Sequence, residues 1–319
     1  MIEAKSLCKS YGIFKAVDEL SFKVEAGQVL GFLGPNGAGK STTMKMLTGF
    51  LAPTSGTALI NGVDVVENPV EARKNIGYLP EGAPSYGEMT VHQFLVFVAR
   101  ARLIRKSEVT ASVDRVIQKL NLANVKHQVI ETLSKGFKRR VGLAQAIIHD
   151  PQILILDEPT DGLDPNQKRE VRNLIRRMGE EKVIIFSTHI LEEVDAVCSR
   201  AIIIDQGKIV ADGSPEELRG RSKGAGAVRV KINGMAGSGI RSELSSLGGV
   251  AEVEEIKSSE LGFEGRALPA KASASISEAI FNLCKDRGWI LEELHVEEGR
   301  LDEVFREITV AETKLAKAS

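Results

Sequence analysis

Cysteine is scarce in this chain of 319 residues: Cys8, Cys198 and Cys284 lie far apart and are odd in number. Their spacing fits neither a disulfide framework nor a metal-binding motif, so we expect three reduced thiols in a cytosolic protein. Long apolar runs are also lacking, and none approaches the roughly 20 residues that span a bilayer. The segment Met1 to Lys5 does not have the apolar character of a signal peptide. If the protein works at a membrane, we therefore expect a partner to supply the span.

Charge of one sign is not in excess either, since the formal net charge is −1. That balance favours neither nucleic acid nor an anionic membrane surface as a partner. The hydrophobic fraction is 43% and the charged fraction 27%, which are ordinary values for a globular protein. With this length they allow a sizeable core, and we expect one large domain and a small one.

A glycine-rich loop lies between a short apolar run, Val29–Leu33, and a helix-forming segment. The loop fits the pattern G-x-x-x-x-G-K-[ST] at every required position, and the run before it predicts a buried strand. Backbone N–H groups of such a loop converge on phosphate, and the following helix adds its positive end. Lys40 is expected to reach the terminal phosphates and the Ser41 hydroxyl to bind Mg²⁺. A chance glycine loop is the alternative. The predicted nucleotide-binding residues of this loop are Gly34, Asn36, Gly37, Ala38, Gly39, Lys40, Ser41 and Thr42.

Two carboxylates follow a second apolar run, Ile153–Leu156. Asp157 and Glu158 would be costly there without a cation, and open α/β sheets bind ligands at the carboxyl ends of their strands. We expect Asp157 to hold Mg²⁺, directly or through water, and Glu158 to polarise an attacking water. Capping of a helix ahead of Pro159 is the alternative role for the pair.

A histidine follows a third apolar run, Val183–Phe186, within the sequence Ser187-Thr188-His189. A lone histidine is more often structural than catalytic, but His189 is expected at the same edge of the sheet as the phosphate loop. There it could hydrogen-bond a γ-phosphate or orient water. Tyr11 is expected in a turn upstream of the loop. It could either pack within that turn or stack on a nucleotide base, and the residues alone leave both open.

Residues from about 85 to 150 are expected to form a helical insert. Two apolar faces lie between Thr90 and about Ala123, and a further helix runs to about His149 after the segment Leu133–Phe137. Cations in the first turn of a helix oppose its dipole, so they need an anionic partner or else form a solvated basic turn. The cations concerned are Lys138, Arg139 and Arg140.

The C-terminal part has a pattern of its own. A stretch rich in Gly, Arg, Lys and Ser predicts a linker at residues 221–226. Residues 227–312 then alternate as strand, helix, strand, strand, helix, strand, which suggests a small ferredoxin-like α+β domain without a catalytic constellation. Residues 313–319 are expected to be a frayed tail. A final helix would place four apolar residues on one face: Leu301, Val304, Phe305 and Ile308.

These motifs, in this order, resemble the ATPase subunit of an ATP-binding cassette (ABC) transporter over residues 1–220. The resemblance implies an α/β fold with a P-loop NTPase (RecA-like) core, an antiparallel β subdomain and the helical insert. It also implies that Tyr11 stacks on the base. The matching motifs are Walker A at Gly34–Thr42, Walker B at Ile153–Asp157 with Glu158 as catalytic carboxylate, the D-loop at Asp161–Asp164, and His189 as the switch histidine.

Two positions depart from the family pattern. The signature Leu-Ser-Gly-Gly-Gln appears as Leu133-Ser134-Lys135-Gly136-Phe137, which keeps the serine and glycine that approach the γ-phosphate. The added charge of Lys135 could favour that phosphate. The loop after Leu79 usually begins with glutamine, but here it has Glu81, which should bind metal more directly. Both departures, and the ending Leu301–Phe305, are similar to bacterial exporter ATPases of the gliding-motility and multidrug type.

The resemblance further implies ATP and Mg²⁺ as cofactors and head-to-tail pairing with a second copy or a paralogous ATPase. Each ATP would lie between Walker A of one copy and four residues of the other: Ser134, Lys135, Gly136 and Asp164. An integral-membrane permease would receive the motion, so the protein is expected to be cytoplasmic and peripheral on the inner face of the membrane. No nucleic-acid partner is expected. The alternatives are a soluble ABC ATPase acting on DNA or ribosomes, and a nucleotide-dependent regulatory subunit.

Overall fold

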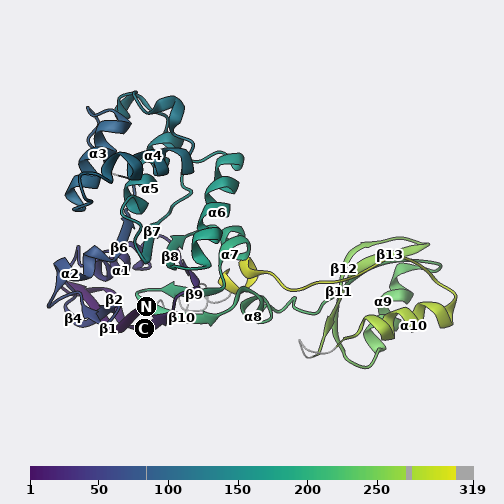
Figure 1. The fold of residues 1–319 in the computed structure, drawn as a ribbon. Helices are drawn as coiled ribbons and strands as arrows, with labels where there is room; N and C mark the ends of the chain where they lie inside the picture. The colour runs from purple at the N-terminus through teal and green to yellow at the C-terminus, as the bar shows by residue number, and fades with distance from the viewer. Residues whose placement is uncertain (84, 271–274, 307–319) are drawn as a thin grey trace. The chain divides into compact units, whose positions relative to one another are not determined.

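Figure 1 shows the chain as a computed structural model, in which residues 1–83, 85–270 and 275–306 are described. Contacts within the chain divide it into two units, Met1–Ser214 and Pro215–Ser319. The first unit contains a six-stranded and a four-stranded sheet, and the second contains one four-stranded sheet. In the described part of the chain, no helix is both long enough and apolar enough to cross a membrane.

The six-stranded sheet of the first unit has the order β10-β9-β3-β8-β7-β6. All neighbouring strands are parallel except β10 and β9. The carboxyl ends of β3, β6, β7 and β8 therefore meet at one edge, where open α/β sheets bind their ligands. The strands are β3 (Val29–Leu33), β6 (Ile76–Leu79), β7 (Ile153–Asp157), β8 (Val183–Thr188), β9 (Arg200–Asp205) and β10 (Lys208–Gly213).

Alternate residues of β7 serve two hydrophobic cores on opposite faces of this sheet. Ile153 and Ile155 belong to the core shared with the antiparallel sheet and α1, whereas Leu154 and Leu156 belong to the core shared with the helices α3 to α6. All four are 0% exposed. Burial on both faces explains why the strand is a continuous apolar run in the sequence, and the strand predicted there is confirmed.

A second sheet of the first unit is antiparallel and has the order β2-β1-β4-β5. Two of its strands, β1 and β2, come before the phosphate loop in the sequence, and β4 and β5 come after it. Asn61 (φ 52°) and Gly62 (φ 84°) close the β4–β5 hairpin in the left-handed region that a two-residue turn requires. Tyr11 is the last residue of β1 and pairs with Phe14. The prediction that Tyr11 lies in a turn is therefore wrong. The strands are β1 (Ile2–Tyr11), β2 (Phe14–Val24), β4 (Ser55–Ile60) and β5 (Val63–Asp64).

Helices occupy most of residues 91–147, and a helix is the next element after each of β3, β6, β7 and β8. Thr90 and Gln93 form a capping box at the start of α3, and Ser134 caps α5. Because α5 begins at Lys135, the segment Lys135–Phe137 is its first turn; the prediction that this segment precedes the helix is wrong. The helices are α1 (Lys40–Leu47), α2 (Pro69–Lys74), α3 (Val91–Ala101), α4 (Val109–Lys119), η1 (Ala123–Val125), η2 (Ile130–Thr132), α5 (Lys135–Ile147), α6 (Pro165–Gly179) and α7 (Leu191–Val197).

The second unit is an antiparallel sheet of order β12-β13-β11-β14 with α9 and α10 between its strands. Leu301 and Val304 are buried within a helical segment at 301–306, whereas Ile308 lies outside the described residues. The predicted tail at 313–319 also lies outside them. The elements are α8 (Pro215–Arg219), β11 (Val228–Asn233), α9 (Gly237–Ser246), β12 (Val250–Ser258), β13 (Gly262–Pro269), α10 (Ser277–Arg287) and β14 (Ile290–Val296).

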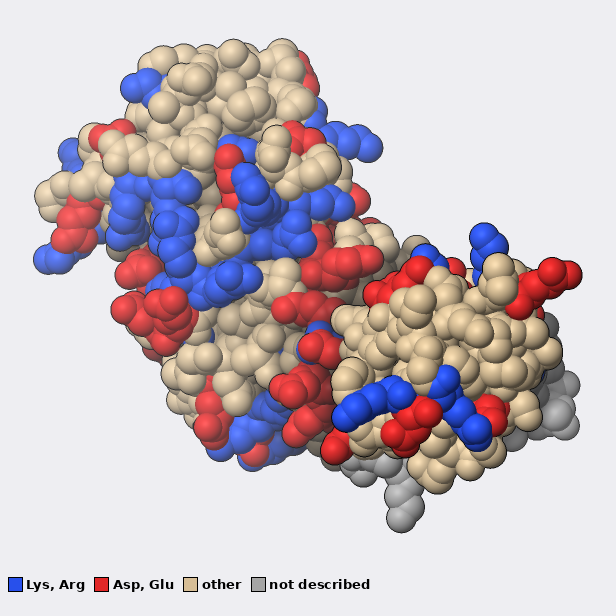
Figure 2. Space-filling view, turned by 90° about the vertical axis from the view of Figure 1, so that its right-hand side faces the viewer, with Lys and Arg blue, Asp and Glu red and all other residues tan. Residues whose placement is uncertain are grey.

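The small net charge conceals a local separation of charges. Figure 2 shows lysine and arginine side chains gathered in a band on one face of the first unit, whereas both signs lie side by side on the second unit. In the second unit Arg229 pairs with Glu264 at 2.7 Å, and Arg266 pairs with Glu254 at 2.9 Å and with Glu297. Such partly exposed pairs contribute little stability individually.

Candidate functional site

A pocket of about 360 Å³ opens at the carboxyl edge of the parallel sheet. It collects residues from four separate segments: the β1–β2 hairpin, the glycine-rich loop, the loop after β6 and the end of β7. Tyr11 contributes a ring that is about half exposed, which is available for stacking. The lining residues are Tyr11, Phe14, Ala16, Asn36, Gly37, Gly39, Lys40, Ser41, Thr42, Glu81 and Glu158.

The glycines of the loop are required by close packing and by backbone conformation. A Cβ at Gly39 would lie 2.4 Å from the carbonyl oxygen of Ala16, and Gly39 has φ 103°. A Cβ at Gly34 would lie 2.4 Å from the carbonyl oxygen of Ile204. Ala38, within the loop, is buried. The backbone can therefore wrap a small anion at the amino end of α1, where the helix dipole adds positive potential.

Lys40 lies at the floor of the pocket with 6% of its surface exposed. Its Nζ donates to the carbonyl oxygens of Gly34 at 2.7 Å and Pro35 at 3.0 Å. Burial lowers the pKa of Lys40 from its usual value, and the nearby carboxylates of Glu158, Asp157 and Glu81 oppose that shift. The ammonium group is thus held within the loop, where a phosphate can replace a carbonyl as its partner.

Asp157 ends β7 and is completely buried. Its Oδ1 accepts a hydrogen bond from the Ser187 hydroxyl, but its Oδ2 is buried without a hydrogen-bond partner among the described residues. A buried carboxylate oxygen without a donor fits a metal ion or a metal-bound water. Ser41 and Glu81 line the adjoining pocket, and with Asp157 they would offer oxygen donors of the kind that Mg²⁺ prefers. In the described part of the chain no group of three or more His, Cys, Asp and Glu side chains could hold a metal, so phosphate oxygens would have to supply further ligands.

Glu158 follows Asp157 and adopts the left-handed conformation, with φ 49°. Its Oε1 lies 3.2 Å from Nδ1 of His189, which follows β8. The structure therefore brings together Glu158 and His189, two of the three predicted catalytic side chains, of which Lys40 is the third. A non-glycine residue in this conformation is uncommon and persists only where its surroundings hold it, as at many active sites.

The chain is similar in sequence to ATP-binding proteins of ABC transporters. Residues 17–161 match the family model described as ABC transporter. The "probable multidrug ABC transporter ATP-binding protein YbhF" of Escherichia coli is 40% identical over 223 residues, which are 70% of this chain and 38% of YbhF. The "uncharacterized ABC transporter ATP-binding protein YxlF" of Bacillus subtilis is 39% identical over 219 residues, which are 69% of this chain and 72% of YxlF. The chain belongs to the ABC transporter ATP-binding proteins.

Two further comparisons agree with that membership. The "Nod factor export ATP-binding protein I" of Rhizobium meliloti is 39% identical over 218 residues, which are 68% of this chain and 65% of the relative. A solved ATP-binding subunit of an ABC transporter superposes with a TM-score of 0.64 at 29% identity, covering 69% of this chain and 92% of the other. The predicted P-loop NTPase fold of an ABC ATPase is thereby confirmed. The chain spans only 38% of the length of YbhF, so it matches part of that protein.

Arg139 contacts the loops of the site in this ABC cassette, and the sequence did not predict these contacts. The side chain is 6% exposed, and its guanidinium donates to the carbonyl oxygens of Asp157, Glu158 and, at 3.3 Å, Pro80. Burial lowers the pKa of Arg139, and Asp161, Asp157, Glu158 and Glu81 raise it. Arg139 thus ties α5 to both carboxylate-bearing loops of the site. The alternative of a solvated basic turn is wrong for this residue.

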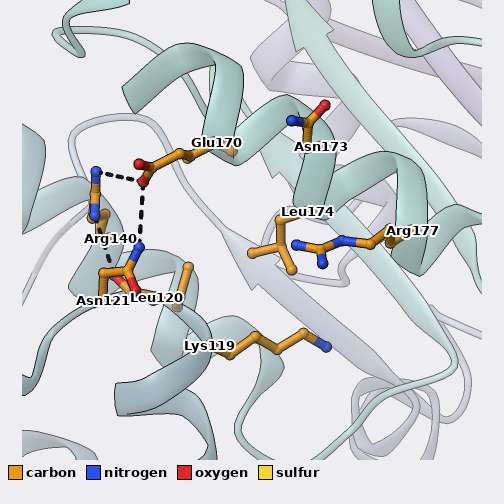
Figure 3. Close-up of a pocket in the computed structure, with 9 residues that line it drawn as sticks. Lys119, Leu120, Asn121, Arg140, Glu170, Asn173, Leu174 and Arg177 are labelled. Atoms are coloured by element: carbon orange, nitrogen blue, oxygen red, sulfur yellow. Dashed lines mark hydrogen bonds and ion pairs between the residues drawn. The ribbon is translucent and has the colours of Figure 1, made fainter. Parts of the chain in front are cut away.

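Arg140 is buried as well, but it faces a different pocket of about 150 Å³ between α4, α5 and α6. Figure 3 shows its guanidinium beside Glu170, at 3.1 Å, with Asn121 on the same carboxylate at 3.4 Å. Its other nitrogen donates to the carbonyl oxygen of Leu120 at 3.4 Å. Arg140 therefore joins three helices of the cassette, and the solvated-turn alternative is wrong here too.

The signature and D-loop residues lie together but outside the lining of the nucleotide pocket. Ser134 Oγ accepts from the Phe137 N–H at 3.4 Å, and Asp164 Oδ1 accepts from the Gln167 N–H at 2.9 Å. A Cβ at Gly136 would lie 2.3 Å from Oε1 of Gln167, so the amino ends of α5 and α6 are neighbours. Lys135 lies in the same turn of α5. One copy of the cassette thus presents two separate surfaces rather than a single closed site.

Proposed function

We propose that this chain is the ATP-hydrolysing subunit of an ABC transporter and powers export by a separate membrane-spanning permease. The observation that carries the proposal is the single pocket that gathers the phosphate loop, Lys40 and Glu158. Export is supported by the names of two relatives, a multidrug transporter protein and a Nod factor export protein. In this proposal the protein is cytoplasmic and is held at the inner face of the membrane by its permease.

Within this function each side chain has a defined role. The loop N–H groups and Lys40 bind the phosphates, Thr42 lies beside them, and Tyr11 stacks on the base. Ser41, Asp157 and Glu81 would hold Mg²⁺, which when bound would supply positive charge against the charge that develops on the phosphate. An Oε of Glu158 accepts the proton of the attacking water, and His189, already 3.2 Å from Glu158, orients that water or the γ-phosphate.

The second surface supplies the rest of the site in a head-to-tail pair of copies, or in a pair with a paralogous ATPase. Ser134, Lys135 and Gly136 of one copy would close over the γ-phosphate bound to the other, with Asp164 at the same interface. Their position outside the pocket lining supports this arrangement. The charge of Lys135 favours the phosphate, so turnover is expected despite the altered signature.

We also propose a division of the chain by role. The ABC ATPase domain would comprise residues 1–220, with its helical subdomain at about 85–150 and a linker at 221–226. Residues 227–312 would form an accessory domain of ferredoxin-like type, which the strand order β12-β13-β11-β14 supports, followed by a tail at 313–319. No nucleic-acid partner is proposed.

Phosphate release from Mg·ATP by the purified full chain tests the enzymatic part of this proposal. We expect turnover by the wild type and loss of both nucleotide binding and turnover in Lys40→Ala. Binding of ATP without any turnover, with or without a co-expressed permease, would favour the regulatory subunit instead. Co-purification with a protein of about six hydrophobic segments would test the coupling to transport.

Glu81→Gln should preserve ATP binding but shift the Mg²⁺ dependence of hydrolysis, because an amide is a weaker magnesium ligand than a carboxylate. We expect the Mg²⁺ concentration at half-maximal rate to rise about tenfold, the scale of losing one partner of a bound metal. Glu88→Gln, an exposed carboxylate of the same loop region, is the control. An unchanged Mg²⁺ titration would count against direct metal contact by Glu81.

A further inference from the structure

Glu193, in α7, is a buried carboxylate to which the roles proposed above assign nothing. It is 1% exposed, and each of its oxygens accepts a hydrogen bond from a threonine hydroxyl. Thr160 Oγ1 donates to Oε1, and Thr188 Oγ1 donates to Oε2 at 2.8 Å. No salt bridge joins Glu193 to a cation within residues 1–83, 85–270 and 275–306, although a buried charge is costly unless it is well bonded.

The two threonines lie next to the proposed catalytic pair, Thr160 in the loop after β7 and Thr188 at the end of β8. Thr160 comes two residues after Glu158, and Thr188 comes directly before His189. The Thr188 hydroxyl also accepts from the Ile190 N–H at 3.0 Å, so the residues on both sides of His189 are held. Glu193 is therefore a bridge between the loop after β7 and the end of β8.

A different bridge joins the same two loops nearer the sheet. The Glu158 N–H donates to the carbonyl oxygen of Ser187 at 3.2 Å and to its hydroxyl at 3.1 Å, and that hydroxyl donates to Asp157. The contact between Glu158 and His189 thus lies between two bridges, one through Ser187 and one through Glu193. Glu158 itself has φ 49°, a conformation that needs such support from its surroundings.

We propose that Glu193 is a positioning residue for hydrolysis, which fixes the separation of Glu158 and His189 through Thr160 and Thr188. It acts through these threonines and does not line the nucleotide pocket. A carboxylate suits the role because both of its oxygens accept, one from each loop, whereas an amide offers a single acceptor oxygen. With Gln at this position, one of the two hydroxyls would lose its charged acceptor and would have to turn to accept from the amide N–H instead, which weakens that side of the bridge.

This inference rests on the proposed ATPase function, and steady-state hydrolysis by the full chain tests it. Glu193→Gln should lower kcat about tenfold or more while the KM for ATP and the affinity for a non-hydrolysable ATP analogue stay within about twofold. Glu192→Gln, an exposed neighbour in α7, should leave both constants unchanged. Thr160→Val should reproduce the fall in kcat, and Thr160→Ser, which keeps the hydroxyl, should restore it. The threonine variants also decide the question if Glu193→Gln fails to fold.

Combining Glu193→Gln with Glu158→Gln distinguishes a positioning role of Glu193 from an effect on stability alone. If Glu193 acts by positioning Glu158, Glu193→Gln should add no further loss to the residual rate of that variant. The proposal is overturned if kcat of Glu193→Gln equals that of Glu192→Gln, if Thr160→Ser behaves as Thr160→Val, or if the two glutamine substitutions lower the rate additively. A wild type that binds ATP without hydrolysing it would instead overturn the proposed function.

Discussion

Glu158→Gln is expected to lower ATP hydrolysis by about 10²–10⁴-fold while ATP binding is retained, the scale of removing a general base. The amide has the same shape as the carboxylate and can still contact Nδ1 of His189. It cannot take the proton of the attacking water. Because binding precedes hydrolysis, the variant should accumulate with ATP trapped between two copies, as a dimer that separates only slowly.

Rapid-quench measurement of phosphate and light scattering of the protein in Mg·ATP would follow the two effects separately. Lys40→Ala is the informative control, because loss of the phosphate contact should abolish the dimer together with hydrolysis. The outcome that excludes Glu158 from its assigned role is a Glu158→Gln variant with wild-type turnover. A variant that fails to bind ATP would place the defect in the fold instead of the chemistry.

Arg139→Met should cost both stability and turnover. Three carbonyl oxygens, of Pro80, Asp157 and Glu158, would lose a charged donor inside the protein. Leaving buried acceptors unsatisfied costs on the order of 3 kcal/mol in the free energy of unfolding. Because these carbonyls belong to the segments that carry Glu81 and Glu158, hydrolysis is expected to fall even at temperatures where the variant stays folded.

Thermal unfolding and phosphate release, measured on the same samples, would show the two effects. Lys138→Met, in the same turn of α5 but only half-buried, is the matched control and should change the free energy of unfolding by less than about 1 kcal/mol. If Arg139→Met matched this control in both measurements, the guanidinium would have no role in holding the two loops.

The parallel strands and the phosphate loop were predictable because a short segment of sequence carries the pattern for each of them. Ile153–Asp157 is buried on both faces, so it is a continuous apolar run in the sequence, and Val29–Leu33 has the predicted bounds. Gly39 needs a positive φ, a requirement that sequence expresses directly as glycine. Carboxylates placed directly after buried strands likewise marked the edge at which ligands bind.

What sequence did not predict depends on contacts between distant segments. For Arg139 the sequence left open an anionic partner or a solvated turn, whereas its guanidinium donates to backbone carbonyl groups 18 and 19 residues away. The bonds of Glu193 to Thr160, 33 residues away, and to Thr188 gave no pattern in the sequence. Tyr11 was expected in a turn because Ser10, Gly12 and Lys15 surround it in the sequence, whereas its pairing with Phe14 extends the strand.

The central claim is that two copies share each ATP site, and mixing two inactive variants tests it most directly. Lys40→Ala removes the phosphate contact of one surface, and Gly136→Asp places a negative charge on the other, so neither variant should hydrolyse ATP alone. A mixed pair contains one intact site, and random pairing of equal amounts should restore up to about a quarter of the wild-type rate. No recovery, under conditions where mixed pairs are shown to form, would contradict a site built from two copies.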